Sequence, residues 1–223
     1  MRLRLALLVA AVTLVPAFSA SAATAPAPTG SAEKIRVLLK VPMVFQAPLG
    51  VWDKVHEDSC EEASITMVKG FVDKRSSFTK QDMEDRLHSL VAWQIKNFGF
   101  FESTSAALTV RMAKEKLGLD LEIKPVKTAE DIKRELRAGR PVILPTAGKL
   151  LGNPNFKNGG PPYHMLVVKG YTDNYFITNE PGTRKGLSYY YPQWRLVLAA
   201  HDWSKTDQTK SPKVMLVLKT AKK

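Results

Sequence analysis

The stretch that decides the fold is residues 55–68, VHEDSCEEASITMV, which contains Cys60, the one cysteine of the chain. Ser59 is a favoured residue at a helix N-terminus, and Glu62 follows at the spacing of a reciprocal capping box. We therefore predict that a helix begins at Cys60.

The helical period places the Cys60 thiol on the apolar side of this helix, which continues through Ala63, Ser64, Met67, Val68 and Phe71. The side chains expected to point elsewhere are Glu61, Glu62 and Lys69. Free amides and the positive end of the helix dipole favour an anion at a helix start, so we expect a lowered thiol pKa. The alternative is a structural cysteine that acts only as a small buried apolar side chain.

The N-terminus has the composition of a secretory signal peptide, because basic residues precede an apolar run at 5–16 and small residues follow up to Ala22. The apolar run is too short to span a bilayer. We expect a secreted, periplasmic or cell-surface product whose mature chain has no transmembrane segment and no room for transporter domains. The expected organisation is a signal peptide at 1–22, a linker at 23–32 and one folded domain at 33–223.

The mature chain is strongly basic. Removing residues 1–22 takes away two of the 33 Lys and Arg residues and none of the 21 Asp and Glu residues, which leaves a net charge of 31 − 21 = +10. This charge favours contact with anionic envelope polymers or membrane surfaces. The basic residues are dispersed and not interleaved with aromatic residues, so we do not expect nucleic-acid binding.

The histidines show no metal-binding spacing, and we expect neither a metal nor a cofactor. They are isolated in the sequence, at His56, His88, His164 and His201. We interpret His56, His88 and His201 as surface or structural residues. The aromatic side chains that we assign to core packing rather than to a substrate platform are Tyr189, Tyr190, Tyr191, Trp194 and Trp203.

Helical patterns fill the first half of the domain and strand patterns the second, which predicts an α+β fold with segregated layers. After the Cys60 helix, capping residues predict helices at 79–99, 103–116 and 128–139. Strands are expected at 119–123, 141–145, 163–171, 175–180, 188–191 and 214–219, with a helix at 192–201. The loop at 146–162 is rich in Gly, Pro and Asn and is expected to border a cleft.

A cysteine at a helix start, a histidine at a later strand start and a polar residue on the next strand follow the order of papain-like hydrolases. Four segments resemble the bacterial cysteine peptidases of family 39, the papain-like group of double-glycine leader peptidases and their stand-alone relatives. These segments are Val41 and Pro42 with Gln46, DSCEEAS at 58–64, HMLVVKGY at 164–171, and NEPGTR at 179–184. The resemblance implies a papain-like cysteine proteinase fold, with the helical first half packed on an antiparallel sheet from the second half.

The resemblance also implies roles for individual residues. Cys60 would be the nucleophile and His164 the general base and acid. The side-chain amide of Gln46, with the backbone N–H of Cys60, would stabilise the oxyanion. Glu180 stands where the family has an Asp that orients the histidine, and Glu61 stands where many members have glycine.

Asn179 is the alternative to Glu180 as the residue that orients His164, and the turn between the two strands decides between them. A three-residue loop at 172–174 puts Glu180 on the face of His164, whereas a two-residue turn at 173–174 puts Asn179 there. We favour the longer loop and Glu180.

The sequence therefore predicts an exported thiol hydrolase, a peptidase that cleaves amide bonds through an acyl-enzyme on Cys60. One alternative is a non-catalytic module that binds peptides or envelope components on the same fold. Another is a related acyl transferase or amidase, because the residues specify acyl-enzyme chemistry and not the acceptor.

Overall fold

The structure is a computed structural model that describes residues 33–220, so the expected signal peptide at 1–22 and linker at 23–32 lie outside the described residues. Within 33–220, seven strands form one antiparallel sheet in the order β2-β7-β3-β4-β5-β6, with β1 paired to one end of β4. The strands are β1 (Val37–Leu38), β2 (Leu121–Pro125), β3 (Val142–Ala147), β4 (Tyr163–Tyr171), β5 (Tyr175–Asn179), β6 (Tyr189–Pro192) and β7 (Val214–Leu218).

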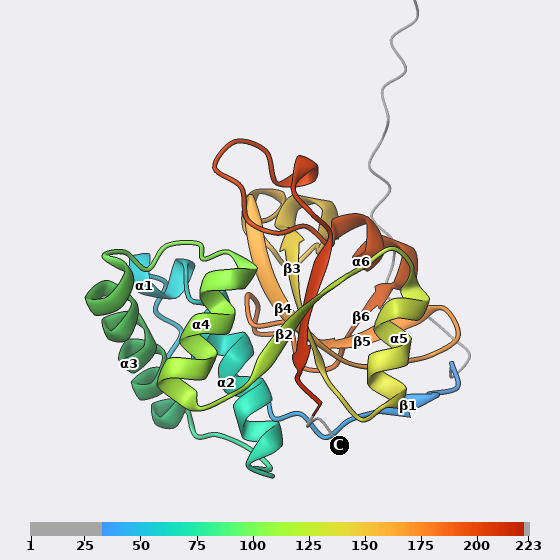
Figure 1. Cartoon of the computed structure of the whole chain (residues 1–223), viewed down its shortest axis with the longest axis horizontal. Helices are drawn as coiled ribbons and strands as arrows, with labels where there is room; N and C mark the ends of the chain where they lie inside the picture. Colours follow the sequence, from blue (N-terminus) through green and yellow to red (C-terminus); the bar gives the residue numbers. More distant parts are fainter. Residues whose placement is uncertain (1–32, 221–223) are drawn as a thin grey trace, which may run out of the picture.

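The helices lie on both sides of this sheet. Figure 1 shows α1 to α4 gathered on one side, while α5 and α6 lie on the other. The helices are α1 (Lys54–Glu57), α2 (Cys60–Val72), α3 (Lys80–Phe98), α4 (Ala106–Leu117), α5 (Ala129–Arg137) and α6 (Gln193–Ala199), with 3-10 turns η1 (Gly148–Leu151), η2 (Lys157–Gly159) and η3 (Gln208–Lys210). The expected α+β fold, with helices first and strands later, is confirmed.

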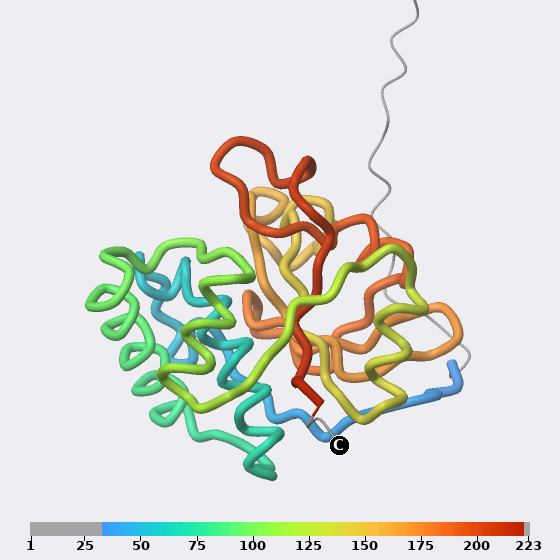
Figure 2. The backbone as a smooth tube through the Cα atoms, viewed as in Figure 1, coloured from blue at the N-terminus to red at the C-terminus, as the bar shows by residue number. Residues whose placement is uncertain are grey.

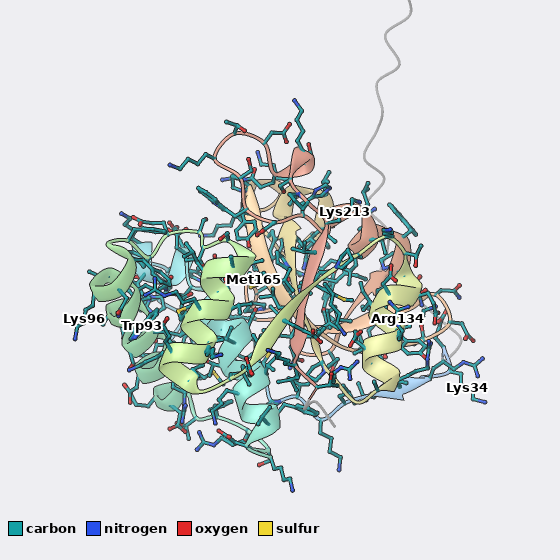
Figure 3. All side chains as sticks on the ribbon, viewed as in Figure 1. Lys34, Trp93, Lys96, Arg134, Met165 and Lys213 are labelled. Atoms are coloured by element: carbon teal, nitrogen blue, oxygen red, sulfur yellow. The ribbon has the colours of Figure 1, made fainter. Side chains whose placement is uncertain are left out.

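The sheet separates two apolar cores, and alternate residues of its strands point into each. Met165 and Val167 of β4 pack with α2, α3 and α4, whereas Leu166 and Val168 pack with α5 and α6. Figure 3 shows Met165 in the interior, between the helical side and the sheet. All nine residues of β4 are buried, which explains its nearly continuous apolar sequence.

Local capping signals explain the ends of several helices. Thr79 and Asp82 form a capping box at the start of α3, and Gly99 ends this helix in the left-handed conformation at φ 82°. Thr128 and Asp131 form a second capping box at the start of α5.

The capping box predicted at the start of α2 is wrong. The Ser59 hydroxyl donates to the carbonyl of Val55 at 2.6 Å and makes no cap bond. Val55 belongs to α1, a helix that we did not predict because its four residues are too few to show a hydrophobic period. Ser59 therefore joins α1 to α2.

The hairpin between β4 and β5 has a two-residue turn, so the predicted three-residue loop is wrong. The amide of Thr172 donates to the carbonyl of Tyr175 at 2.8 Å, which leaves residues 173 and 174 as the turn. A β-bulge between Val168 and Gly170 then shifts the register by one residue, and Val167 pairs with Asn179. The bulge reverses the parity that the shorter turn would impose and brings Glu180 onto the face of His164.

The segment that follows β1 runs along one end of the molecule from the sheet side to the helical side, as Figure 2 shows. It leads into α1, and Gln46 in this segment contacts Glu57, the last residue of that helix. Among residues 33–220, none of the helices has the length and apolar character needed to cross a membrane.

Candidate active site

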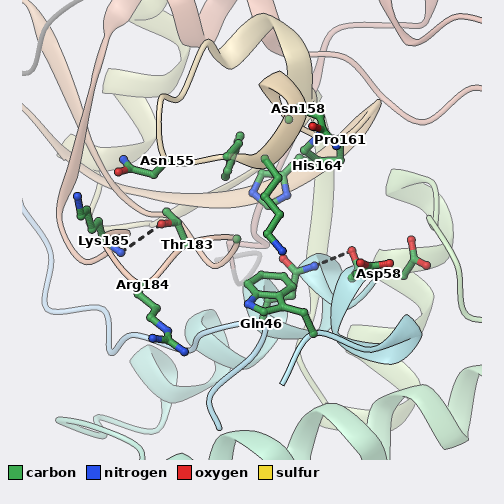
Figure 4. A pocket seen from close by; sticks show the side chains of 15 residues that line it. Gln46, Asp58, Asn155, Asn158, Pro161, His164, Thr183, Arg184 and Lys185 are labelled. Carbon is green, nitrogen blue, oxygen red and sulfur yellow. Dashed lines mark hydrogen bonds between the residues drawn. The ribbon is translucent and has the colours of Figure 1, made fainter. Parts of the chain in front are cut away.

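A cavity of about 640 Å³ opens beside His164, the second residue of β4. Its lining also includes residues from the segment 155–161, which precedes β4, and from 182–185, which follow β5, together with Gln46, Trp52, Glu57 and Asp58. Figure 4 shows Gln46 and His164 facing the same cavity. The loop at 146–162 therefore borders a cleft, as the sequence predicts.

His164 and Glu180 form a buried pair. Nε2 of His164 lies 2.5 Å from Oε1 of Glu180, and the two side chains are 2% and 0% exposed. A carboxylate in this position accepts Nε2–H, which leaves Nδ1 with the lone pair that can take a proton. The backbone N–H of Gly182 donates to the same carboxylate oxygen at 3.0 Å. A Cβ at residue 182 would lie 3.0 Å from the His164 ring, so a side chain there would require the ring to shift by a few tenths of an ångström.

Tyr191 completes the environment of Glu180, a role that we did not foresee. Its hydroxyl donates to Oε2 of Glu180 at 3.0 Å and accepts from Nδ2 of Asn153 at 2.7 Å. The assignment of Tyr191 to the core is correct in that the ring is buried, but the phenol also holds the carboxylate in place. This contact could have been anticipated from the assignment of Tyr191 to the core, because a buried tyrosine hydroxyl requires a hydrogen-bond partner.

Asn179 is turned away from His164. Its side-chain amide donates to the carbonyls of Val41 and Pro42 at 3.1 and 3.3 Å. The Asn179 side chain therefore fastens the segment before Gln46 to the sheet, and Glu180 is the residue that contacts the histidine.

Cys60 begins α2, and its sulfur lies 2.9 Å from Oε2 of Glu61, to which the thiol donates. Burial raises the Cys60 pKa well above its usual range, and the charge of Glu61 raises it further. The backbone N–H of Met165 opposes this shift. The expected lowering of the thiol pKa is therefore wrong for this conformation, and no hydrogen bond joins Cys60 to His164 in the described chain.

Glu61 and Glu62 do not point away from the core, contrary to prediction; they are 1% and 0% exposed. The start of α2 is enclosed on all sides by the sheet, α3 and the segment before α4, so this part of the helix has no solvent face. Oε1 of Glu61 accepts from the backbone N–H of Thr104 at 2.7 Å, and Glu62 accepts from the side-chain amide of Gln94. Burial raises the pKa of both carboxyl groups, and that of Glu62 well above the usual range.

Gln46 lines the cavity but also holds the chain around it. Its Nε2 donates to the carbonyl of Glu57 at 2.8 Å, and its backbone N–H donates to the carbonyl of Pro181 at 3.0 Å. One of the two side-chain amide hydrogens is thus occupied, and the other is free to serve a ligand.

Two further histidines are brought together outside the cavity. Although they are isolated in the sequence, His56 and His88 converge with Glu84 between α1 and α3. His201 is a buried structural residue, as expected, and its Nδ1 lies 2.9 Å from the carbonyl of Ser211.

Charges of opposite sign surround the cavity. Lys157, Arg184 and Lys185 contribute basic side chains to the lining, and Glu57 and Asp58 contribute acidic ones. Figure 4 shows Arg184 and Lys185 across the cavity from Asp58. Elsewhere the basic side chains are dispersed, and Figure 3 shows Lys34, Lys96, Arg134 and Lys213 around the outside of the molecule.

A model of the Peptidase C39-like family matches residues 38–211, which covers most of the chain and includes Gln46, Cys60, His164 and Glu180. The chain belongs to the Peptidase C39-like family. This confirms the resemblance seen in the sequence, and the family name indicates a cysteine peptidase.

One solved structure supports the same fold for this C39-like chain. A structure from Bacillus anthracis assigned as a C39-like peptidase is similar with a TM-score of 0.56 and 17% identity, covering 86% of this chain and 100% of that one. A double-glycine motif protease of an AMS/PCAT transporter, solved with a leader peptide, has a TM-score of 0.46 and 17% identity, covering 83% and 96%. A search of curated proteins found no match.

Proposed function

We propose that this C39-like protein is an exported cysteine peptidase that cleaves amide bonds through an acyl-enzyme on Cys60. The observation that carries the proposal is the buried His164–Glu180 pair, whose histidine lines a cavity together with Gln46 and Asp58. An imidazole held by a carboxylate at one nitrogen is equipped to move a proton at the other.

In the proposed reaction, the proton of the Cys60 thiol passes to Nδ1 of His164, and the sulfur attacks the carbonyl carbon of the substrate. The backbone N–H of Cys60 and the free hydrogen of the Gln46 amide stabilise the oxyanion. The imidazolium then gives its proton to the leaving amine, and the acyl group stays on sulfur. Water, deprotonated by His164, releases the acyl group and restores the thiol.

This reaction requires the thiol to leave Glu61. In the described conformation, Cys60 donates to Glu61 and is 5% exposed, so the catalytic state needs a rotation of the side chain away from that carboxylate. Glu180 supports the step because its negative charge stabilises the imidazolium that forms.

The cavity favours a peptide as the substrate. Its volume of about 640 Å³ lies within the usual range of ligand sites, and its lining carries both signs of charge together with the aromatic rings of Trp52 and Phe156. Basic Arg184 and Lys185 would hold an acidic part of the substrate, and Glu57 and Asp58 a basic part. Export is proposed from the signal-peptide composition of residues 1–22.

A second candidate is a non-catalytic peptide-binding module, and the environment of Cys60 favours it. The hydrogen bond from Cys60 to Glu61 and the raised thiol pKa both oppose a thiolate at neutral pH.

Incubation of the protein with a peptide library, followed by mass spectrometry of the products, separates the two functions. We expect new peptide termini with the wild type and none with Cys60→Ser. Peptides that bind equally to both proteins without being cleaved would overturn the peptidase and support the binding module.

A further inference from the structure

Two helices bring three possible metal ligands together outside the cavity. His56 comes from α1, while Glu84 and His88 lie one turn apart on α3. Nε2 of His56 is 3.0 Å from Oε1 of Glu84, and Nε2 of His88 is 3.1 Å from the same oxygen. The three ligand atoms lie within 4.8 Å of one another.

These separations are close to those around a tetrahedral ion. Zinc bound at about 2.0–2.1 Å by nitrogen and oxygen places neighbouring ligand atoms about 3.3 Å apart. The two observed separations from Glu84 are a few tenths of an ångström shorter, and the third, between the two histidine nitrogens, is at most 4.8 Å, so the side chains would adjust around a common centre when an ion binds.

The hydrogen bonding of His56 also points to a cation. Nδ1 of His56 lies 2.8 Å from Oδ1 of Asp53, whose carboxylate accepts Nδ1–H. The other nitrogen, Nε2, then directs its lone pair at the carboxylate of Glu84. Two acceptors facing each other need a positive centre between them, either a metal ion or a second proton on the ring. A carboxylate behind a histidine is the usual outer support of a metal ligand.

Glu84 adds an independent observation. Its Oε1 faces both histidines, while its Oε2 is buried and has no hydrogen-bond partner among residues 33–220. A second acceptor without a donor, beside two imidazoles, increases the negative potential at this point and would be relieved by a bound cation.

We propose that His56, Glu84 and His88 form a binding site for a divalent transition-metal ion, with Zn²⁺ as the favoured ion. Two imidazole nitrogens and one carboxylate suit zinc, whereas magnesium and calcium prefer ligand sets made only of oxygen. The side chain of His88 is 51% exposed, so solvent can reach the site and supply a fourth ligand.

The ion would connect α1 to α3. The carbonyl of Glu57, the residue after His56, accepts a hydrogen bond from the side chain of Gln46, which lines the cavity. The metal site is therefore adjacent in sequence to a contact at the cavity. His56, Glu84 and His88 are absent from the cavity lining, and metal binding is therefore a separate property from the proposed peptidase activity.

Isothermal titration with ZnCl₂ and thermal unfolding test this site, with Cys60→Ser as the background so that the thiol cannot bind zinc. We expect one Zn²⁺ per chain and a higher melting temperature, and no such change with MgCl₂. Asp53→Asn removes only the carboxylate behind His56 and should weaken Zn²⁺ binding by roughly tenfold to hundredfold. His88→Ala removes a ligand and should weaken Zn²⁺ binding by more than that.

Ser89→Ala is the matched control on the same helix, since Ser89 is exposed and adjacent to His88. It should bind zinc like the background protein. If His88→Ala does not fold, His88→Asn takes its place. The proposal is overturned if zinc binding is absent, if it survives in the His88 variant, or if it is lost only with His164→Ala. Absent binding would leave the cluster as a hydrogen-bonded link between α1 and α3.

Discussion

The Cys60 thiol donates to Glu61, the next residue of α2, across 2.9 Å. Both side chains are buried, and the carboxylate has no solvent to screen it. Glu61 therefore favours the thiol form of Cys60, which opposes the thiolate that the proposed reaction needs.

Replacing Glu61 by glutamine should increase the reactivity of Cys60 toward iodoacetamide at neutral pH. Glutamine can still accept from the N–H of Thr104, but it removes the charge that raises the Cys60 pKa. Each unit by which the pKa falls raises the thiolate fraction about tenfold below the pKa. Rates of alkylation measured from pH 6 to 10 give this shift.

Glu62→Gln is the matched control, because Glu62 is equally buried but bonds to Gln94 and not to the thiol. It should change the alkylation rate less. Equal rates for Glu61→Gln and the wild type would show that Glu61 does not control the thiol.

Glu62→Gln should instead alter the dependence of stability on pH. Burial raises the Glu62 pKa well above its ordinary value of 4.5, so the folded protein holds a proton that the unfolded chain has released. The free energy of unfolding therefore falls as pH rises from about 4.5 toward the raised pKa. The loss is about 1.4 kcal/mol for each unit by which the pKa is raised.

Urea unfolding at pH 5 and pH 8 tests this effect. The variant should gain stability relative to the wild type at pH 8, with a smaller gain at pH 5. A difference that is the same at both pH values would contradict a raised Glu62 pKa.

Glu180→Gln should lower turnover by roughly 10²- to 10⁴-fold, the usual contribution of acid–base catalysis. The amide cannot stabilise the imidazolium as the carboxylate does, and it no longer selects the Nε2–H tautomer. ¹⁵N NMR of the His164 ring would report the change of tautomer directly.

Asn179→Ala serves as the comparison, because its side chain bonds to the carbonyls of Val41 and Pro42 and not to His164. It should lower stability and leave the His164 tautomer unchanged. A tautomer change in Asn179→Ala but not in Glu180→Gln would transfer the orienting role to Asn179.

Gln46→Ala should lower kcat by about 10²- to 10³-fold, because an oxyanion donor acts in the transition state. Alkylation of Cys60 and the KM for a cleavable peptide should change little. Steady-state kinetics on the cleaved peptide measure both constants, and an unchanged kcat would remove Gln46 from the site.

Much of the fold could be predicted from local patterns. The capping boxes at Thr79 and Thr128 and the stop at Gly99 involve only neighbouring residues, so they are visible in the sequence. The family resemblance added Cys60, His164 and Glu180 as a set, and the structure brings His164 and Glu180 into contact.

The remaining features depend on contacts distant in sequence. Glu61 is buried because tertiary packing encloses the start of α2, and the hydrophobic period of the helix sequence does not predict this burial. The predicted three-residue loop between β4 and β5 is wrong, and the bulge at Lys169 decides which residue after β5 lies on the face of His164. His56 and His88 are 32 residues apart and meet only after α1 and α3 pack together.

The most direct test of the proposed peptidase is the intact mass of the native protein after treatment with a peptide-based thiol-directed electrophile, followed over time. We expect a single adduct on Cys60, formed without denaturant, and much slower formation in His164→Ala. An adduct that needs denaturant, or that forms equally fast in both proteins, would contradict the proposed peptidase and identify Cys60 as a structural cysteine.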